Sequence, residues 1–275
     1  MKSNFIAYKN STIHYSIYGN GLRLLFCFHG YGEDAECFNL LEAALGSDYT
    51  LIAMDMPFHG KTVWQDGLLF TVYDLIALMQ RIITSIHLIN QSIPQQPTYS
   101  LLGYSMGGRI ALQLLQKSPK DIERVVLAAP DGLHKNLWYR FAISLIGNKV
   151  FKYATHRPPG SFSVLKVIEK LKLAHPSWLK IVHYYTDEEN ERLLLYRRWT
   201  TMRKFRPNLP LLKKLIKRHA LPVRFLFGRF DNIIVSSRSD IFKDDTQNVQ
   251  VHIIDAGHRL MQEKYVPVIS NLFYQ

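Results

Sequence analysis

The sequence is poor in cysteine: Cys27 and Cys37 are the only two among 275 residues, so no disulfide framework is expected. No run of 18 apolar residues occurs, and we therefore expect no transmembrane helix. Residues 1–5 are not followed by the apolar stretch of a signal peptide. These absences favour a protein of the reducing cytoplasm.

Metal and nucleotide motifs are absent as well. The 11 histidines show no metal-ligand spacing such as H-E-x-x-H. The glycines at 103, 107 and 108 do not form a G-x-G-x-x-G loop, and they follow a late strand instead of opening a first strand–helix unit. We therefore expect neither a metal nor a cofactor.

Acidic residues are scarce in one segment. Residues 133–219 hold 19 Lys and Arg but only 5 Asp and Glu, a net charge of +14, whereas the remainder holds 15 and 17, a net charge of −2. This shift predicts a core domain made of residues 1–132 and 220–275, and a basic helical domain of residues 133–219. No nucleic-acid-binding motif accompanies the charge, so a nucleic-acid partner is not expected.

The basic band from Arg197 to Arg218 has two readings. It attracts an anionic substrate or makes weak contact with an anionic membrane surface. Alternatively, it is a solvated helical face whose long side chains cover apolar surface. The segment 137–146 is apolar on nearly every side, and it either lines an acyl-binding pocket, which makes Trp138 a candidate substrate contact, or packs on the core domain.

Apolar runs alternate with helical patterns along the rest of the chain. Such strands, buried on both faces, predict a mostly parallel sheet with helices on both sides, the architecture of an α/β protein. The expected strands cover residues 5–8, 12–18, 23–28, 50–54, 98–102, 122–128, 222–227 and 249–254, and the expected helices cover 34–45, 71–89, 110–115 and 265–274.

Ser105 lies where one of these strands turns sharply into a helix. The stretch LLGYSMGGRI places it between Gly103 and Gly107, where a Cβ would clash with the closely approaching chain. Such a turn forces its central residue into a strained conformation and raises the hydroxyl above the sheet, at a helix N-terminus that favours negative charge. This G-x-S-x-G pattern predicts a nucleophilic serine.

Other polar residues follow other strands. Asp131, Asp231 and His258 each come directly after a predicted strand, as does the turn HGYG at 29–32. Sites in parallel sheets form at the carboxyl ends of strands. A serine hydroxyl needs a base such as histidine, and the histidine needs a carboxylate to fix its tautomer. The strand ends therefore predict a Ser–His–Asp site.

With these residues the chain resembles the α/β-hydrolase superfamily over nearly its whole length, with a cap domain inserted after the sixth strand. The resemblance rests on five pieces: HGYG at 29–32, DMPFHGKT at 55–62, GYSMGG at 103–108, GRFDNIIV at 228–235 and AGH at 256–258. It implies a serine hydrolase in which Ser105 is the nucleophile, His258 the base and Asp231 the orienting acid. Asp131 is the alternative acid, because some members place theirs after the sixth strand.

The resemblance also implies an oxyanion hole made by the backbone N–H groups of Tyr31 and Met106, with Gly30 or Gly32 as alternatives to Tyr31. His29 and Gly30 are expected beside the substrate, although His29 more ordinarily orients its own loop. Arg109 is a further candidate substrate contact.

Three functions remain open. The first is cleavage of a carboxylic ester or related acyl bond of a small molecule, either anionic or apolar, through an acyl-enzyme on Ser105. The second follows from the similarity of GYSMGGRIAL to the menaquinone-pathway 2-succinyl-6-hydroxy-2,4-cyclohexadiene-1-carboxylate synthases, lyases whose arginines hold substrate carboxylates, a role for Arg109 here. The third is a ligand receptor without catalysis.

Overall fold

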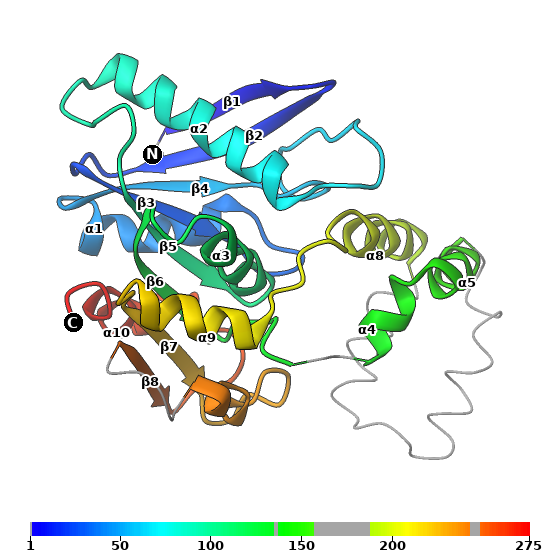
Figure 1. Ribbon diagram of the computed structural model, residues 1–275. Coiled ribbons are helices and arrows are strands. Elements are labelled where there is room, and N and C mark those ends of the chain that lie inside the picture. The colour runs from blue at the N-terminus through cyan, green and yellow to red at the C-terminus, as the bar shows by residue number, and fades with distance from the viewer. Residues whose placement is uncertain (1, 135–136, 157–187, 243–247) are drawn as a thin grey trace. The chain divides into compact units, whose positions relative to one another are not determined.

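The computed structural model describes residues 2–134, 137–156, 188–242 and 248–275. Their centre is an eight-stranded sheet with the strand order β1-β2-β4-β3-β5-β6-β7-β8 (Figure 1). The strands are β1 (Lys2–Tyr8), β2 (Ser11–Tyr18), β3 (Arg23–Phe28), β4 (Tyr49–Met54), β5 (Tyr99–Tyr104), β6 (Ile122–Ala128), β7 (Val223–Gly228) and β8 (Val249–Ile254).

Most of the sheet is parallel. β1 pairs with β2, and β2 with β4, in antiparallel fashion, and every further neighbouring pair is parallel. All six residues of β4, β5 and β7 are buried. This burial explains why these strands have continuous apolar runs instead of alternating patterns. The predicted mostly parallel α/β sheet is confirmed.

Helices cover both faces of the sheet (Figure 1). On one face α3 packs against both α2 and α9, and the 3-10 helix η1, α1 and α10 form a second group on the other. Their bounds are η1 (Ala35–Leu41), α1 (Glu42–Leu45), α2 (Val72–Ile89), α3 (Met106–Lys117), α9 (Leu209–Arg218) and α10 (Val266–Asn271), with the short 3-10 helices η3 (Ser236–Phe242) and η4 (Glu263–Tyr265) near the C-terminus.

α2 is the one helix in the described ranges with the length and mean hydropathy, 1.4, of a membrane span. Thr71 and Asp74 form a capping box at its N-terminus. Asp74 also accepts hydrogen bonds from Tyr8, the last residue of β1, and from Lys9, which follows it, and the helix buries a continuous apolar stripe that includes Leu75 and Ile82. A one-sided buried stripe is typical of a core helix of a globular domain.

The chain divides into two compact units. The first comprises residues 1–66, 70–134 and 204–275, and the second comprises 67–69 and 135–203. The second unit contains α4 (Leu137–Ala142), α5 (Leu145–Thr155) and α8 (Glu189–Thr201). Inside it, Trp199 packs against Tyr139 and Phe151, and Asn148 donates a hydrogen bond to Thr200. The role of this unit as a cap stays a prediction.

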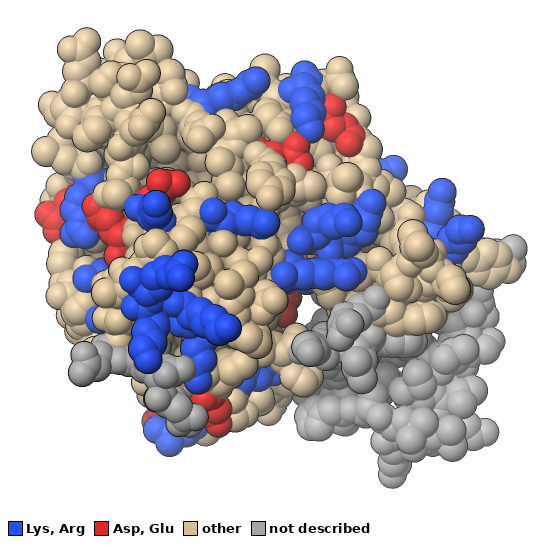
Figure 2. Space-filling model, in the orientation of Figure 1, with Lys and Arg blue, Asp and Glu red and all other residues tan. Residues whose placement is uncertain are grey.

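The boundary expected at residue 219 differs from this division. Residues 204–219 belong to the first unit, because Leu212 and Ile216 of α9 are fully buried and α9 packs on α3. Figure 2 shows Lys and Arg gathered over α9, where Lys214, Lys217 and Arg218 are exposed. The positive charge of 133–219 is therefore divided between the two units.

Candidate active site

Ser105 occupies a tight turn between β5 and α3. β5 ends at Tyr104 and α3 begins at Met106, so one residue makes the whole turn. Ser105 has φ of 50° and ψ of −112°, a left-handed conformation that costs free energy for any residue with a Cβ. The strain is held by hydrogen bonds from Ser105 N to Ala128 O and from Asp131 N to Ser105 O. The strained turn expected from the sequence is present.

Two glycines permit this turn. A Cβ on Gly103 would lie 2.6 Å from the carbonyl oxygen of Gly107, and a Cβ on Gly107 would lie 1.8 Å from that of Phe28. Both distances are below any real van der Waals contact, and both neighbours are backbone atoms that cannot rotate away. The spacing of G-x-S-x-G is therefore a packing requirement of β3, β5 and α3.

A hydrogen-bonded relay leads from this serine to a buried carboxylate. Ser105 Oγ lies 3.0 Å from Nε2 of His258, and Nδ1 of the same ring lies 2.8 Å from Oδ2 of Asp231. Because an ionised carboxylate can only accept, Nδ1 carries the ring proton and Nε2 accepts from the serine. Asp231 follows β7 and His258 follows β8, so the structure brings together residues from three of the strand ends that the sequence singled out.

Asp231 is held as a carboxylate by its neighbours. Its side chain is fully buried, and burial alone would raise its pKa. The hydrogen bond from His258 and those from the backbone N–H groups of Ile234 and Ile233 outweigh burial and lower the pKa below its usual value. An ionised acid at this position fixes the tautomer in which His258 can accept a proton from Ser105.

Asp131, the alternative acid, is bound elsewhere. Its Oδ2 atom lies 3.5 Å from Nε of Arg109, and its Oδ1 accepts a hydrogen bond of 2.7 Å from the backbone N–H of Gly132. Arg109 is only 8% exposed. The geometry therefore favours Asp231 over Asp131 as partner of His258. It also places Arg109 against a protein carboxylate, where the sequence suggested a substrate carboxylate.

His29 connects two loops at the edge of the site. The ring is completely buried, its Nε2 accepts a hydrogen bond from the N–H of Met56, and its Nδ1 lies 2.7 Å from the carbonyl oxygen of Gly30. The proton is therefore on Nδ1, and both ring nitrogens are bonded to protein. Substrate contact by His29 is not supported, and the role that fits is the orientation of its own loop.

Met106, Tyr31 and Gly30 lie just after β5 and β3 in the first unit, whereas Trp138 belongs to the second unit. Met106 is the first residue of α3, so its N–H is one of those that a helix leaves without an intrahelical acceptor. Tyr31 lies in the turn after β3, with its ring against His59. Gly30 packs against Glu33 and the Tyr104 ring. Trp138 lies in α4, but its side chain is outside the described part of the chain.

Two residues beside the relay were not predicted. Tyr104 donates a hydrogen bond of 3.2 Å to the carbonyl oxygen of His258, and burial raises the pKa of its phenol. Glu33 follows the turn at 29–32, and burial raises its pKa, offset in part by a hydrogen bond from Gly30 and by His258. Tyr104 precedes the nucleophile in the last position of a buried strand, so its apolar ring suggested only core packing.

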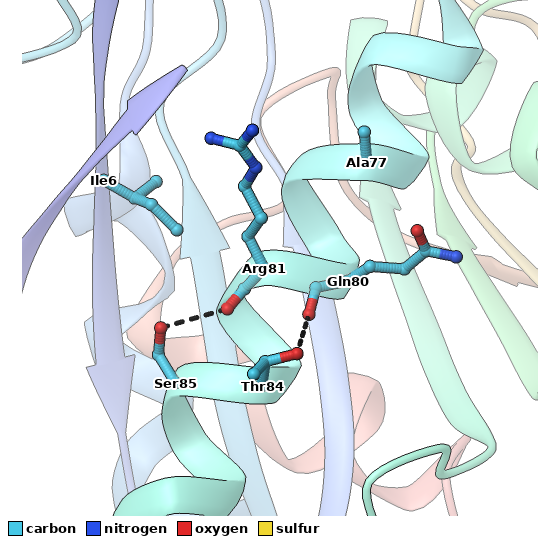
Figure 3. A pocket seen from close by; sticks show the side chains of 6 residues that line it. All are labelled: Ile6, Ala77, Gln80, Arg81, Thr84 and Ser85. Carbon is cyan, nitrogen blue, oxygen red and sulfur yellow. Dashed lines mark hydrogen bonds between the residues drawn. The ribbon is translucent and has the colours of Figure 1, made fainter.

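A shallow hollow elsewhere on the molecule is not part of this site. It lies between β1 and α2 (Figure 3) and holds none of the predicted site residues. The hydroxyls of Thr84 and Ser85 are bonded to carbonyl groups one turn earlier in α2. Its lining consists of Ile6, Ala77, Gln80, Arg81, Thr84 and Ser85.

The family model described as serine aminopeptidase, S33, matches residues 21–265 of the chain. The protein is an α/β-hydrolase. Two solved structures of similar fold support this assignment. The α/β-hydrolase MGS-M2 from a Medee basin deep-sea metagenome library has a TM-score of 0.68 at 16% identity, covering 99% of this chain and 98% of that one. A thermophilic esterase from Thermogutta terrifontis has a TM-score of 0.67 at 16% identity, covering 100% and 98%.

Relatives found by sequence are also hydrolases. This α/β-hydrolase is 28% identical over 178 residues to a serine hydrolase-like protein of Danio rerio, which covers 62% of this chain and 50% of that protein. It is 27% identical over 119 residues to a pimeloyl-acyl-carrier-protein methyl ester esterase of Salmonella heidelberg, covering 43% and 41%. The chain thus spans half or less of the length of these relatives.

Proposed function

We propose that this α/β-hydrolase cleaves a carboxylic ester or a related acyl bond through an acyl-enzyme on Ser105. The observation that carries the proposal is the relay of Ser105, His258 and Asp231, with heavy-atom distances of 3.0 and 2.8 Å. Nucleophile, base and orienting acid within hydrogen-bond reach are the signature of an activated serine. The ester substrate named for the Salmonella relative is consistent with this reaction class.

In this mechanism Ser105 attacks the acyl carbonyl while Nε2 of His258 takes the hydroxyl proton. Asp231 stabilises the resulting imidazolium, and the N–H groups of Met106 and Tyr31 bind the oxyanion. Loss of one such donor costs about 10²–10³ in rate. His258 then protonates the leaving alcohol, thiol or amine. Water attacks the acyl-enzyme with His258 as base, which releases the acid and restores Ser105.

The substrate we propose is a small acyl compound. The synthase alternative requires arginines that are open to substrate carboxylates, and Arg109 instead pairs with Asp131. The exposed lysines of α9 are the more suitable attraction for an anionic substrate, acting over a distance instead of by direct contact.

The test is labelling with a fluorophosphonate together with hydrolysis of p-nitrophenyl esters of increasing chain length, with wild type and Ser105→Ala side by side. We expect covalent labelling at Ser105 and turnover by the wild type only. Labelling without turnover of any ester would direct attention to the synthase reaction. Tight ligand binding without labelling would support the receptor, and it would refute an activated Ser105.

A further inference from the structure

A second chain of serine, histidine and aspartate lies at the other end of the sheet. Ser3 Oγ lies 2.8 Å from Nε2 of His14, and Nδ1 of His14 lies 2.7 Å from Oδ2 of Asp55. Ser3 belongs to the edge strand β1, His14 to β2, and Asp55 directly follows β4. None of these residues belongs to the relay around Ser105.

The two arrangements share more than their residue types. The carboxylate of Asp231 accepts two backbone N–H groups besides its histidine, and Asp55 does the same with the N–H groups of Ala35 and Lys61, each at 2.7 Å. The side chains of His14 and Asp55 are each 1% exposed, whereas Ser3 is exposed to solvent. The base and its acid are thus fixed inside the protein, and the serine that bonds to them lies at its surface.

Proton positions follow from this geometry. A carboxylate that takes N–H groups from the backbone acts as an acceptor, so Nδ1 of His14 carries the proton that lies toward Asp55. Nε2 is then left as an acceptor and takes the hydroxyl proton of Ser3. A serine whose hydroxyl bonds to an imidazole held in place by a carboxylate has the geometry required for general-base activation.

We propose that Ser3 is a second activated hydroxyl, an acylation site for activated acyl esters. Ser3 Oγ forms a bond to the acyl carbon as its proton passes to Nε2 of His14. The bond from the acyl carbon to the leaving oxygen breaks, and the leaving group takes the proton from His14. The products are an O-acyl ester of Ser3 and a free alcohol or phenol.

The site differs from Ser105 in one respect that determines its outcome. Ser105 precedes the first turn of α3, whereas Ser3 lies within β1, whose backbone pairs with β2. Ser3 is thus not followed by a helix whose first N–H groups could bind an oxyanion, because the residues described after it continue β1. His14 assists the first attack, but the acyl ester is not hydrolysed quickly. We expect a stoichiometric adduct that accumulates, without turnover.

The experiment uses Ser105→Ala, so that the proposed active-site serine contributes no adduct. The protein is treated with p-nitrophenyl acetate, and acetyl occupancy is measured by peptide mass spectrometry. Hydroxylamine distinguishes a serine ester, which it cleaves, from an acetylated lysine such as Lys2 or Lys9. Ser47, an exposed serine between α1 and β4 that bonds to no histidine among the described residues, is the internal comparison.

We expect hydroxylamine-sensitive acetylation of Ser3 at least about a hundredfold faster than at Ser47, the low end of general-base assistance. His14→Gln, if its circular dichroism and melting are those of the parent, should bring Ser3 down to the rate of Ser47. Equal rates at Ser3 and Ser47 in the parent would overturn the proposal even if His14→Gln does not fold. A folded His14→Gln that leaves Ser3 acetylation unchanged would overturn it too. Neither result bears on Ser105.

Discussion

The carbonyl oxygen of Phe28, the last residue of β3, occupies the space that a side chain at Gly107 would need. The ideal Cβ position at Gly107 lies 1.8 Å from that oxygen. The close approach sets α3 against the end of β3, and so it places the start of α3 beside the turn at 29–32. The position of Ser105 therefore depends on Gly107, a residue of the following helix that has no side chain.

Gly107→Ala should destabilise the fold strongly, because neither the β3 backbone nor α3 can withdraw. We expect a loss of at least about 3 kcal/mol in the free energy of unfolding, measured by urea denaturation. Gly257→Ala is the matched control, because a Cβ there meets no described heavy atom within 4 Å. Equal stability losses in the two variants would contradict this account of the turn.

Asp231→Asn should leave the structure intact but remove most activity. An amide can donate to Nδ1 of His258 and thereby stabilise the tautomer that cannot accept from Ser105. In serine proteases the corresponding change lowers kcat by about 10⁴-fold, and we expect a loss of that order in ester hydrolysis. Asp131→Asn removes the pairing with Arg109 instead and should cost far less. If Asp131→Asn were the more damaging variant, the roles of the two acids would be reversed.

Tyr104→Phe should lower kcat severalfold with little change in KM. The variant keeps the buried ring but loses the hydroxyl, which donates a hydrogen bond of 3.2 Å to the carbonyl oxygen of His258. The loop of His258 is then less firmly positioned, at a cost of about 1 kcal/mol in stability. Steady-state kinetics and thermal unfolding measure the two effects. An unchanged kcat would limit Tyr104 to core packing.

Asp74→Asn should destabilise the protein in a pH-dependent way. Partial burial raises the pKa of Asp74, but hydrogen bonds from Lys9, Thr71 and Tyr8 lower it to about 2. Because the folded pKa is below the unfolded value, this carboxylate stabilises the fold above about pH 4, and the contribution is lost as the pH falls toward 2. We expect about 1 kcal/mol near neutral pH, a figure reduced for solvent screening.

Urea unfolding of wild type and Asp74→Asn at neutral pH and near pH 2.5 measures this difference. The gap between the two proteins should narrow at the lower pH. A gap that stays constant would mean that Asp74 acts through its shape at the start of α2 and not through its charge.

Sequence patterns predicted the sheet well, because β3, β5 and β7 are buried on both faces and so carry unbroken apolar runs. They also singled out Ser105, Asp231 and His258, since each lies within four residues of the end of a predicted strand, although β8 itself has no fully buried residue. The segment expected as a helix at 34–45 is mainly the 3-10 helix η1. Its N-cap is Asp34, whose side chain accepts a hydrogen bond from the backbone N–H of Glu36. Periodicity alone cannot separate two helix types over so few residues.

Other features depend on tertiary contacts that no local pattern contains. Net charge assigned α9 to the basic domain, but the burial of Leu212 and Ile216 assigns it to the first unit. The pairing of Arg109 with Asp131 joins an early turn of α3 to the loop after β6. In the sequence these two residues gave separate hypotheses, a substrate contact and a triad acid, because their proximity was not visible.

The relay is assembled from chain segments that leave the ribosome at very different times. Ser105 and its turn are synthesised before residues 135–203 of the second unit, whereas Asp231 and His258 come after them, beyond the ends of β7 and β8. β7 pairs with β6 only after residues 135–203 have been made. A nascent chain therefore carries its serine for more than a hundred residues before a base is available. An activated Ser105 would then arise only after residue 258 has been made, so that nascent chains that have not reached His258 would not be acylated at this position.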